Sequence, residues 1–367
     1  MNKILYVHIG TGKTGTTALQ DFFLLNQEAL RAAGINYCAT GLVKNNHHLV
    51  CRNFERDNEA TQQKVTENLL KLNFEIQESN CPFHLISSEY FPGMTREEIL
   101  ELSESMDAEV VPIVYLRRQD EFLESWYAQI VKAYNVKSDI HSLMHRLEKE
   151  KILDYRSLVE GWAVVNSGGI VRVRPYEKDS FIGGSIFSDF LSAIDSGVGL
   201  EALKIPVRDP NPSIRPAQIR MGMKLYDYCS EKQRKVIFSS FPEVKDSSRF
   251  FLSRSERQDL IDRYSSINAY VAKKFLGKEL LFLELDAPEE KECSDFSFLE
   301  GFVLTLFMEY PESLQEIEEP LVKLLKLEAG NARNGDLQRA MDYLKLALLV
   351  RPDGPHIRNM LKSCINA

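Results

Sequence analysis

A short loop rich in glycine and threonine carries the strongest chemical signal in the sequence. Residues 10–17 read GTGKTGTT and follow a short apolar run. Successive backbone N–H groups in such a turn converge, and the N-terminus of a following helix adds positive potential, so a phosphate group is the favoured ligand. Lys13 adds a charge and the threonines add hydroxyl donors. The expected anion-binding residues are Gly12, Lys13, Thr14, Gly15, Thr16 and Thr17.

A second cationic position follows a later apolar run. The segment EVVPIVYL (109–116) is followed by Arg117 and Arg118, and Ser125 comes eight residues after Arg117. No predicted strand ends in an aspartate suited to holding Mg²⁺. The position after residue 116 therefore favours a second phosphate over a metal ion.

The substring Gly12-Lys13-Thr14 is similar to the end of an ATP-binding P-loop, but the complete motif does not fit. The pattern GxxxxGK[ST] needs a glycine five residues before Gly12, and that residue is Val7. Because the match is only partial, a P-loop kinase of a small molecule or sugar is an alternative and not the first choice of enzyme. A non-catalytic nucleotide-binding scaffold is an alternative of another class.

Strands and helices that alternate along the chain would position both cationic sites. Five short apolar segments predict strands, and helical spacing from Thr16 to Gly34 predicts one long helix. This order predicts an α/β fold, a parallel sheet flanked by helices, in which ligands bind at the carboxyl ends of the strands. The five predicted strands are 3–9, 34–38, 82–88, 109–116 and 169–176.

The end of the chain has a different character. Ten acidic residues and one basic residue lie between Pro288 and Pro320, and residues 321–367 fit one tetratricopeptide-like helical hairpin with its turn at Gly335-Asp336. Such hairpins usually need neighbours to bury their faces, so this one is expected to pack on the main domain or on another subunit. A plain capping hairpin and a module for a protein partner or self-association are the two alternatives. The predicted organisation is a catalytic domain (1–287), an acidic linker with a short helix (288–320) and a small all-α appendage (321–367).

The two cationic sites together resemble the signature of the sulfotransferases that use 3′-phosphoadenosine 5′-phosphosulfate (PAPS). Their 5′-phosphosulfate loop is similar to Lys13–Thr17, and their 3′-phosphate site is similar to the pair Arg117 and Ser125. The segment RVRPYEKD resembles the family's strand that ends in Tyr-Glu, which implies that Tyr176 lies near the nucleotide. The likeness covers roughly residues 1–285 and is closer to bacterial carbohydrate-type members.

The sequence departs from the cytosolic animal members, because it lacks their Arg-Lys-Gly triplet. The remaining contacts to the 3′-phosphate or the adenine are therefore unassigned, with Arg118 and residues near Asn211 as candidates. Otherwise the resemblance implies a P-loop-like sulfotransferase fold, with PAPS as co-substrate and no metal. It also implies sulfuryl transfer to a hydroxyl or amine of a carbohydrate or glycoconjugate.

The resemblance implies that Lys13 stabilises the oxygen that bridges the phosphate and the sulfuryl group. An acceptor also needs a general base at a neighbouring strand end. Glu89, which follows the predicted strand 82–88, is the first choice, because partial burial raises the pKa of a carboxyl group. His48, or its neighbour His47, is the alternative, since imidazole suits base chemistry near neutral pH.

Composition bounds the remaining classes. The 367 residues include 45 Lys and Arg against 53 Asp and Glu, a net charge of −8, so no nucleic-acid partner is expected. The apolar run 302–308 is far shorter than the roughly 20 residues that span a bilayer, so no transmembrane segment is expected. Six cysteines without CxxC pairs are typical of free thiols, which makes the cytoplasm the expected location.

Overall fold

The computed structural model divides the chain into two compact units. The first contains residues 1–123, 143–211 and 254–285, and the second contains residues 124–142, 212–253 and 286–367. The residues that the structure describes are 3–134, 139–194, 197–207, 216–226, 228–230, 232–233, 237, 250–283 and 295–366.

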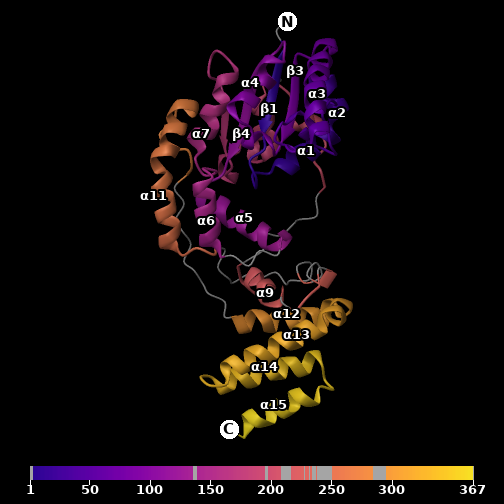
Figure 1. Cartoon of the computed structure of the whole chain (residues 1–367), viewed down its shortest axis with the longest axis vertical. Helices are drawn as coiled ribbons and strands as arrows, with labels where there is room; N and C mark the ends of the chain where they lie inside the picture. Colours follow the sequence, from indigo (N-terminus) through magenta and orange to yellow (C-terminus); the bar gives the residue numbers. More distant parts are fainter. Residues whose placement is uncertain are drawn as a thin grey trace. The chain divides into compact units, whose positions relative to one another are not determined.

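The first unit is built around a five-stranded parallel sheet (Figure 1). Its order is β2-β3-β1-β4-β5, so β1 is central and lies between β3 and β4. Each of the five predicted strands is present, and the prediction of an α/β fold with a parallel sheet is confirmed. The strands are β1 (Ile4–Ile9), β2 (Ile35–Tyr37), β3 (Phe83–Ser88), β4 (Glu109–Leu116) and β5 (Arg172–Pro175).

Helices of the first unit follow these strands. The α-helices lying wholly or partly in it are α1 (Thr16–Leu25), α2 (Gln27–Ala32), α3 (Glu59–Glu78), α4 (Arg96–Glu104), α5 (Gln119–Tyr134), α6 (Ile140–Lys149), α7 (Tyr155–Trp162), α8 (Ile186–Ala193) and α11 (Arg254–Val271). Short turns of helix are η1 (His48–Val50), η2 (Phe91–Gly93), η3 (Ala163–Val165), η4 (Lys178–Ser180), η5 (Ile182–Gly184), η6 (Leu200–Ala202) and η7 (Ala272–Leu276).

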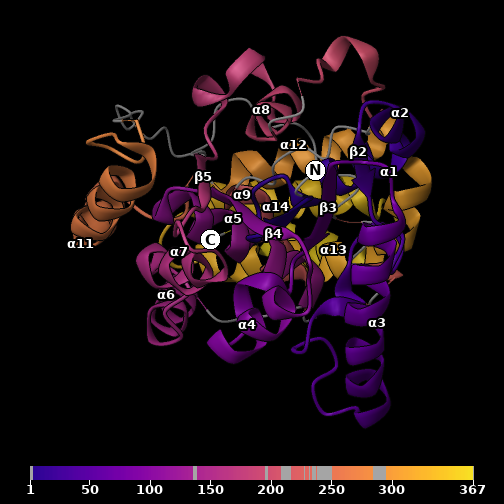
Figure 2. The same cartoon turned by 90° about the horizontal axis from the view of Figure 1, so that it is seen from above.

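Helices lie on both faces of the sheet (Figure 2). The alternating side chains of β1 show which helices cover which face. Leu5, Val7 and Ile9 belong to a core cluster with side chains of α3, α4 and α7. Tyr6 belongs to a second cluster with side chains of α1 and α8. Because successive residues of a strand face opposite sides, the sheet is the middle of three layers. Its core is closed on both faces, so side chains reach solvent at the strand ends.

The helix predicted from Thr16 to Gly34 is two helices. α1 and α2 meet at Asn26, which has φ −110° and ψ 16°. The Nδ2 atom of Asn26 donates to the carbonyl oxygens of Phe22 and Lys204, at 2.8 Å in both cases. An asparagine that binds backbone groups in this way competes with helical hydrogen bonding. The prediction of one continuous helix is therefore wrong at Asn26.

The second unit is helical. Its core contains side chains from five helices, including Leu225 of the first of them, and also Cys229 and Ile237. Asp336 begins α14 by accepting the N–H of Arg339 at 2.9 Å, which confirms the predicted turn before it. Its helices are α9 (Pro216–Tyr226), α12 (Asp295–Glu309), α13 (Pro311–Ala332), α14 (Leu337–Val350) and α15 (Pro355–Ile365).

Helix α13 runs without interruption through a proline. Pro320 has no N–H, so the carbonyl of Glu316 has no donor within the helix. Gln233 Nε2 donates to that carbonyl at 2.7 Å, from a segment 83 residues earlier. The helix thereby crosses residue 320, where the sequence pattern predicted the hairpin to begin.

Two expectations about the whole chain can be compared with its described parts. Cys38, Cys51, Cys81, Cys229 and Cys364 are free and buried. Cys293 lies outside the described residues. Among the helices that the structure describes, none combines the length and the apolar character needed to cross a membrane.

Candidate anion-binding site

The loop between β1 and α1 holds Lys13 and Gly15 in left-handed backbone conformations. Their φ angles are +66° and +74°. A Cβ atom on Gly15 would lie 2.6 Å from Ile186 Cδ1 and 3.2 Å from Tyr176 Cε2, so the position is restricted to glycine twice over. A left-handed lysine costs on the order of 1 kcal/mol, and such strain gathers at functional loops.

Threonine hydroxyls hold the loop from inside. Thr11 Oγ1 donates to the carbonyl of Tyr115 on β4 at 2.5 Å. Thr14 Oγ1 and Thr16 Oγ1 both donate to the carbonyl of Thr11, at 2.6 and 3.2 Å. Thr14 and Thr16 are buried, whereas Thr17 is exposed. The hydroxyl protons of Thr14 and Thr16 therefore stabilise the loop itself, which leaves backbone N–H groups as its donors to a ligand.

The N-terminus of α1 is open to an anion. Gly15 is its N-cap residue, and as a glycine it has no side chain that could cap the first turn. The first four N–H groups of a helix have no intrahelical acceptor, and they carry the positive end of the helix dipole. The loop can thus bind a phosphate or sulfate group beside Lys13.

Arg117 and Tyr176 lie beside this loop. Arg117 Nη1 donates to the carbonyl of Lys13 at 3.2 Å, and the guanidinium carbon lies 5.7 Å from the centre of the Tyr176 ring. Tyr176 in turn contacts Gly15, as the distances above require. The structure therefore brings Lys13, Arg117 and Tyr176 together around one turn, although they are separated by up to 163 residues.

Ser125, the predicted partner of Arg117, follows it by eight residues. It lies on α5, half-buried, and the boundary between the two units passes between Leu123 and Glu124. Arg117 belongs to the first unit and Ser125 to the second. The spacing of this pair along the chain is as predicted, and joint binding of a phosphate by the two residues stays a prediction.

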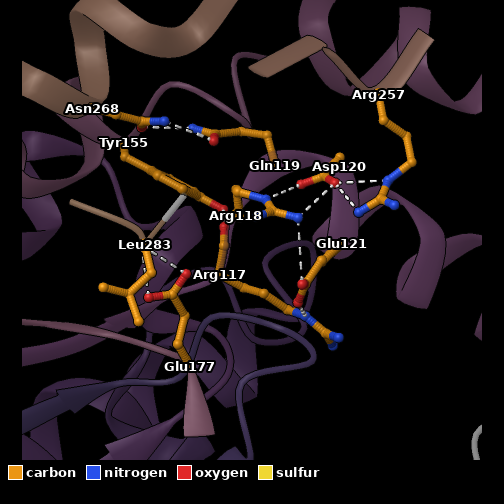
Figure 3. A network of polar contacts seen from close by, with 10 residues as sticks. All are labelled: Arg117, Arg118, Gln119, Asp120, Glu121, Tyr155, Glu177, Arg257, Asn268 and Leu283. Atoms are coloured by element: carbon orange, nitrogen blue, oxygen red, sulfur yellow. Dashed lines mark hydrogen bonds and ion pairs between the residues drawn. The ribbon is translucent and has the colours of Figure 1, made fainter. Parts of the chain in front are cut away.

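A charged network follows Arg117 at the end of β4 (Figure 3). The carboxylate of Asp120 is fully buried and binds Arg118 Nε at 2.7 Å and Arg257 Nη2 at 2.5 Å. Burial raises the pKa of Asp120, but the hydrogen bonds and charges of the two arginines outweigh burial and hold the pKa below its usual value. Arg118, a candidate for a further ligand contact, is in this structure a partner of Asp120.

Neutral contacts reinforce this turn. Gln119 and Asn268 exchange amide hydrogen bonds at 2.9 and 3.0 Å, and both are buried. The hydroxyl of Tyr155 donates to the carbonyl of Arg117. Glu177, the residue after Tyr176, accepts the N–H of Leu283 at 3.1 Å. Helix α11 therefore binds Gln119 and Asp120, which follow Arg117 closely in sequence. The chain after α11 binds Glu177, the neighbour of Tyr176.

The end of β3 presents Glu89 to the opposite side of the loop. The carbonyl of Ser88 accepts the N–H of Gly10 at 3.0 Å, which fixes the start of the loop against β3. Glu89 is exposed as a residue, yet partial desolvation raises the pKa of its carboxyl and the charge of Lys13 opposes that rise. Glu89 and Lys13 are therefore close enough for their charges to interact.

The two candidate histidines differ in their surroundings. His47 is fully buried: Nδ1 accepts the N–H of Ser87 at 3.1 Å, and Nε2 lies 2.8 Å from the carbonyl of Cys38. Both of its ring nitrogens are engaged, and burial lowers its pKa to about 4. His48 is half-buried, with Nδ1 2.8 Å from Ser88 Oγ, and burial lowers its pKa to about 4. His47 is thus a structural residue, while His48 lies next to the residue that precedes Glu89.

A third histidine, His8 on β1, is buried behind the loop. Its Nδ1 lies 2.8 Å from Ser87 Oγ, which also accepts Gln20 Nε2 at 3.2 Å. Burial lowers the pKa of His8 to about 3, so the ring is neutral. His8 is thus a neutral, hydrogen-bonded residue of the core.

Sequence reasoning missed the residues that support Arg117. Asp120, Arg257 and Asn268 lie up to 148 residues apart, and nothing in local spacing joins them. The region near Asn211, a candidate for further ligand contacts, lies outside the described residues.

Comparison with known proteins adds one relative of unknown activity. The chain is 32% identical over 207 residues to an uncharacterized protein of Archaeoglobus fulgidus, and the match covers 54% of this chain. It covers 55% of the relative, so the chain spans about half the length of the protein it matches. No family model matches the chain. No solved structure matches it significantly.

Proposed function

We propose that the protein is a sulfotransferase that moves a sulfuryl group from PAPS to a hydroxyl or amine of a carbohydrate or glycoconjugate. The observation that carries the proposal is the meeting of Lys13, Arg117 and Tyr176 around a left-handed loop at an uncapped helix N-terminus. These are three of the positions at which the sequence resembles the PAPS-dependent family; Ser125 is another.

The donor set suits a doubly anionic nucleotide. Lys13 and the first N–H groups of α1 would hold the 5′-phosphosulfate, and Arg117, with Ser125, would hold the 3′-phosphate. Tyr176 would lie beside the nucleotide. When bound, PAPS supplies an activated sulfuryl group and a phosphate leaving group.

Each proposed catalytic residue has a distinct task. The ammonium of Lys13 stabilises charge that builds on the bridging oxygen, as in phosphoryl transfer. Glu89 accepts the proton of the attacking hydroxyl or amine, and its raised pKa makes it a stronger base than an ordinary carboxylate. His48 is the second candidate for this proton, and Glu89 is preferred because its charge interacts with that of Lys13.

Calorimetry with 3′-phosphoadenosine 5′-phosphate (PAP) and with ATP tests the proposal first. We expect the protein to bind PAP more tightly than ATP, with no change when EDTA removes Mg²⁺. Binding of Mg-ATP that disappears with EDTA, together with indifference to PAP, would instead favour a kinase. Incubation with labelled PAPS and a panel of glycans then identifies the acceptor.

Substitution of Lys13 by alanine tests its catalytic role. We expect kcat/KM for sulfate transfer to fall about 10²–10³-fold, as when one stabilising donor is removed from a transition state. Lys44→Ala is the matched control, because Lys44 is also a lysine with a positive φ, +60°, and it is exposed, whereas Lys13 is half-buried. Unchanged transfer in a folded Lys13→Ala protein would reject the catalytic role of Lys13. A wild-type protein that binds PAP but transfers no sulfate to any acceptor of the panel would favour the non-catalytic scaffold.

A further inference from the structure

The carboxylate of Glu121 forms ion pairs with two guanidinium groups at the end of β4. One carboxylate oxygen lies 3.2 Å from Arg117 Nε, and the other lies 3.6 Å from Arg118 Nη2 (Figure 3). A single carboxylate therefore spans two consecutive arginines, which is the arrangement that a phosphate would adopt there.

The two arginines differ in what else holds them. The side chain of Arg118 is 8% exposed and is bound to the buried Asp120. The side chain of Arg117 is 24% exposed, and its partners in addition to Glu121 are the Lys13 carbonyl and the Tyr176 ring. Arg117 is thus the guanidinium that a ligand at the loop can reach, and Glu121 already uses its Nε.

We infer that Glu121 is an internal counter-ion that weakens the binding of phosphate at Arg117. The inference rests on the proposed function, in which Arg117 takes the 3′-phosphate of the donor. An incoming phosphate meets a carboxylate of its own sign and has to share or displace it. PAP, the product, carries the same 3′-phosphate, so Glu121 also favours its release.

Calorimetry on Glu121→Gln, with PAP and 5′-AMP as paired probes, tests the inference. Glutamine keeps the shape of the side chain and removes the charge. We expect PAP to bind about three- to fivefold more tightly, which is the upper range for a partly exposed charge pair. Binding of 5′-AMP, which lacks the 3′-phosphate, should change less than twofold.

Two further variants separate this effect from general electrostatics. Glu67→Gln removes a carboxylate from another ion pair of the same i,i+4 spacing, with Lys71 on α3, and should leave PAP binding unchanged. Glu121→Asp keeps the charge and should bind PAP as the wild type does. Unchanged or weaker PAP binding by folded Glu121→Gln would overturn the inference, since weaker binding would make Glu121 a residue that orients Arg117.

If the proposed function is wrong, the binding data differ from those expected if only the inference about Glu121 is wrong. If the wild-type protein does not bind PAP, the proposal of a PAPS-dependent enzyme falls. Inorganic pyrophosphate then probes the anion site without the nucleotide. Tighter pyrophosphate binding by Glu121→Gln would keep Glu121 as a counter-ion, and equal binding by both proteins would reject it.

Discussion

The two strand ends that flank the loop are built from opposite kinds of chemistry. At the end of β3, neutral groups predominate: His8, His47 and Gln20 all bind Ser87, and the three are buried. At the end of β4, charges predominate, with Asp120 between Arg118 and Arg257. The same loop therefore lies between a neutral hydrogen-bonded edge and an ionic edge.

This difference separates two tasks. A neutral edge lets a nearby carboxyl such as Glu89 keep a raised pKa, because among the described residues the half-buried Lys13 is the cation that opposes the rise. An ionic edge fixes the backbone that carries Arg117 and keeps cations where an anionic ligand arrives. We therefore expect changes at β3 to affect proton transfer and changes at β4 to affect stability and anion binding.

Glu89→Gln should have the largest effect and should act on chemistry alone. Loss of a general base reduces kcat about 10²–10⁴-fold, while the affinity for PAP stays within twofold of the wild type. In the wild type, kcat should fall as the pH drops through the raised pKa of Glu89, because the protonated carboxyl accepts no proton.

His48→Asn is the comparison variant for this experiment. A larger loss of kcat in His48→Asn than in Glu89→Gln would assign the base to the histidine. A PAP affinity that falls in parallel with kcat in Glu89→Gln would break the separation between the two edges.

Asp120→Asn should destabilise the first unit by about 3–5 kcal/mol, since it leaves two buried arginines without their carboxylate. The folded pKa of Asp120 lies below its unfolded value, so the ion pair stabilises the fold above pH ~4 and is lost as the pH falls through the folded pKa. Urea unfolding followed by circular dichroism measures both effects.

Glu67→Gln, at an exposed ion pair, is the control and should cost under about 1 kcal/mol. A loss of similar size in Asp120→Asn would show that the buried pairs contribute little net stability.

As the pH falls, the stability contributed by the neutral edge should be lost at a higher pH than the stability contributed by the ionic edge. His47 has a folded pKa of about 4 against 6.5 in the unfolded chain, so the unfolded chain takes up the proton first as the pH drops below 6.5. This removes on the order of 3 kcal/mol of stability by pH 4. His47→Gln, which can still donate and accept, should flatten this part of the curve of unfolding free energy against pH.

His356→Gln, at an exposed histidine of α15, serves as its control. His8, with a folded pKa of about 3, adds to the same acid sensitivity and remains in both variants. A curve that keeps its full slope in His47→Gln would contradict the burial of a neutral His47.

The elements of the sheet were predictable because each is a local pattern. Short β-branched runs and the glycine loop are read within ten residues, and all five strands and the position of Lys13 follow from them. The break at Asn26 was not predictable, because one of its two acceptors is the carbonyl of Lys204, 178 residues away.

The candidate site divides in the same way. Lys13 and Arg117 were candidates because each follows a predicted strand, and Tyr176 was a candidate because it ends a predicted strand that resembles one of the family. The roles of His47 and Asp120 depend on partners that lie far apart in sequence, Ser87 at 40 residues and Arg257 at 137. An imidazole in the loop after the second predicted strand made His47 a candidate base. Its structural role is seen only in the fold, where both ring nitrogens form hydrogen bonds.

The proline in α13 determines which fragment of the chain can be expressed with its helices intact. The carbonyl that Pro320 leaves without a helical donor is bound by Gln233, and the core around it includes Leu225 and Cys229. A fragment that starts at residue 288 would lose this donor and expose that apolar surface. Expression of the C-terminal helices as a separate piece therefore calls for the segment around residues 216–233 as well, supplied on the same chain or in trans.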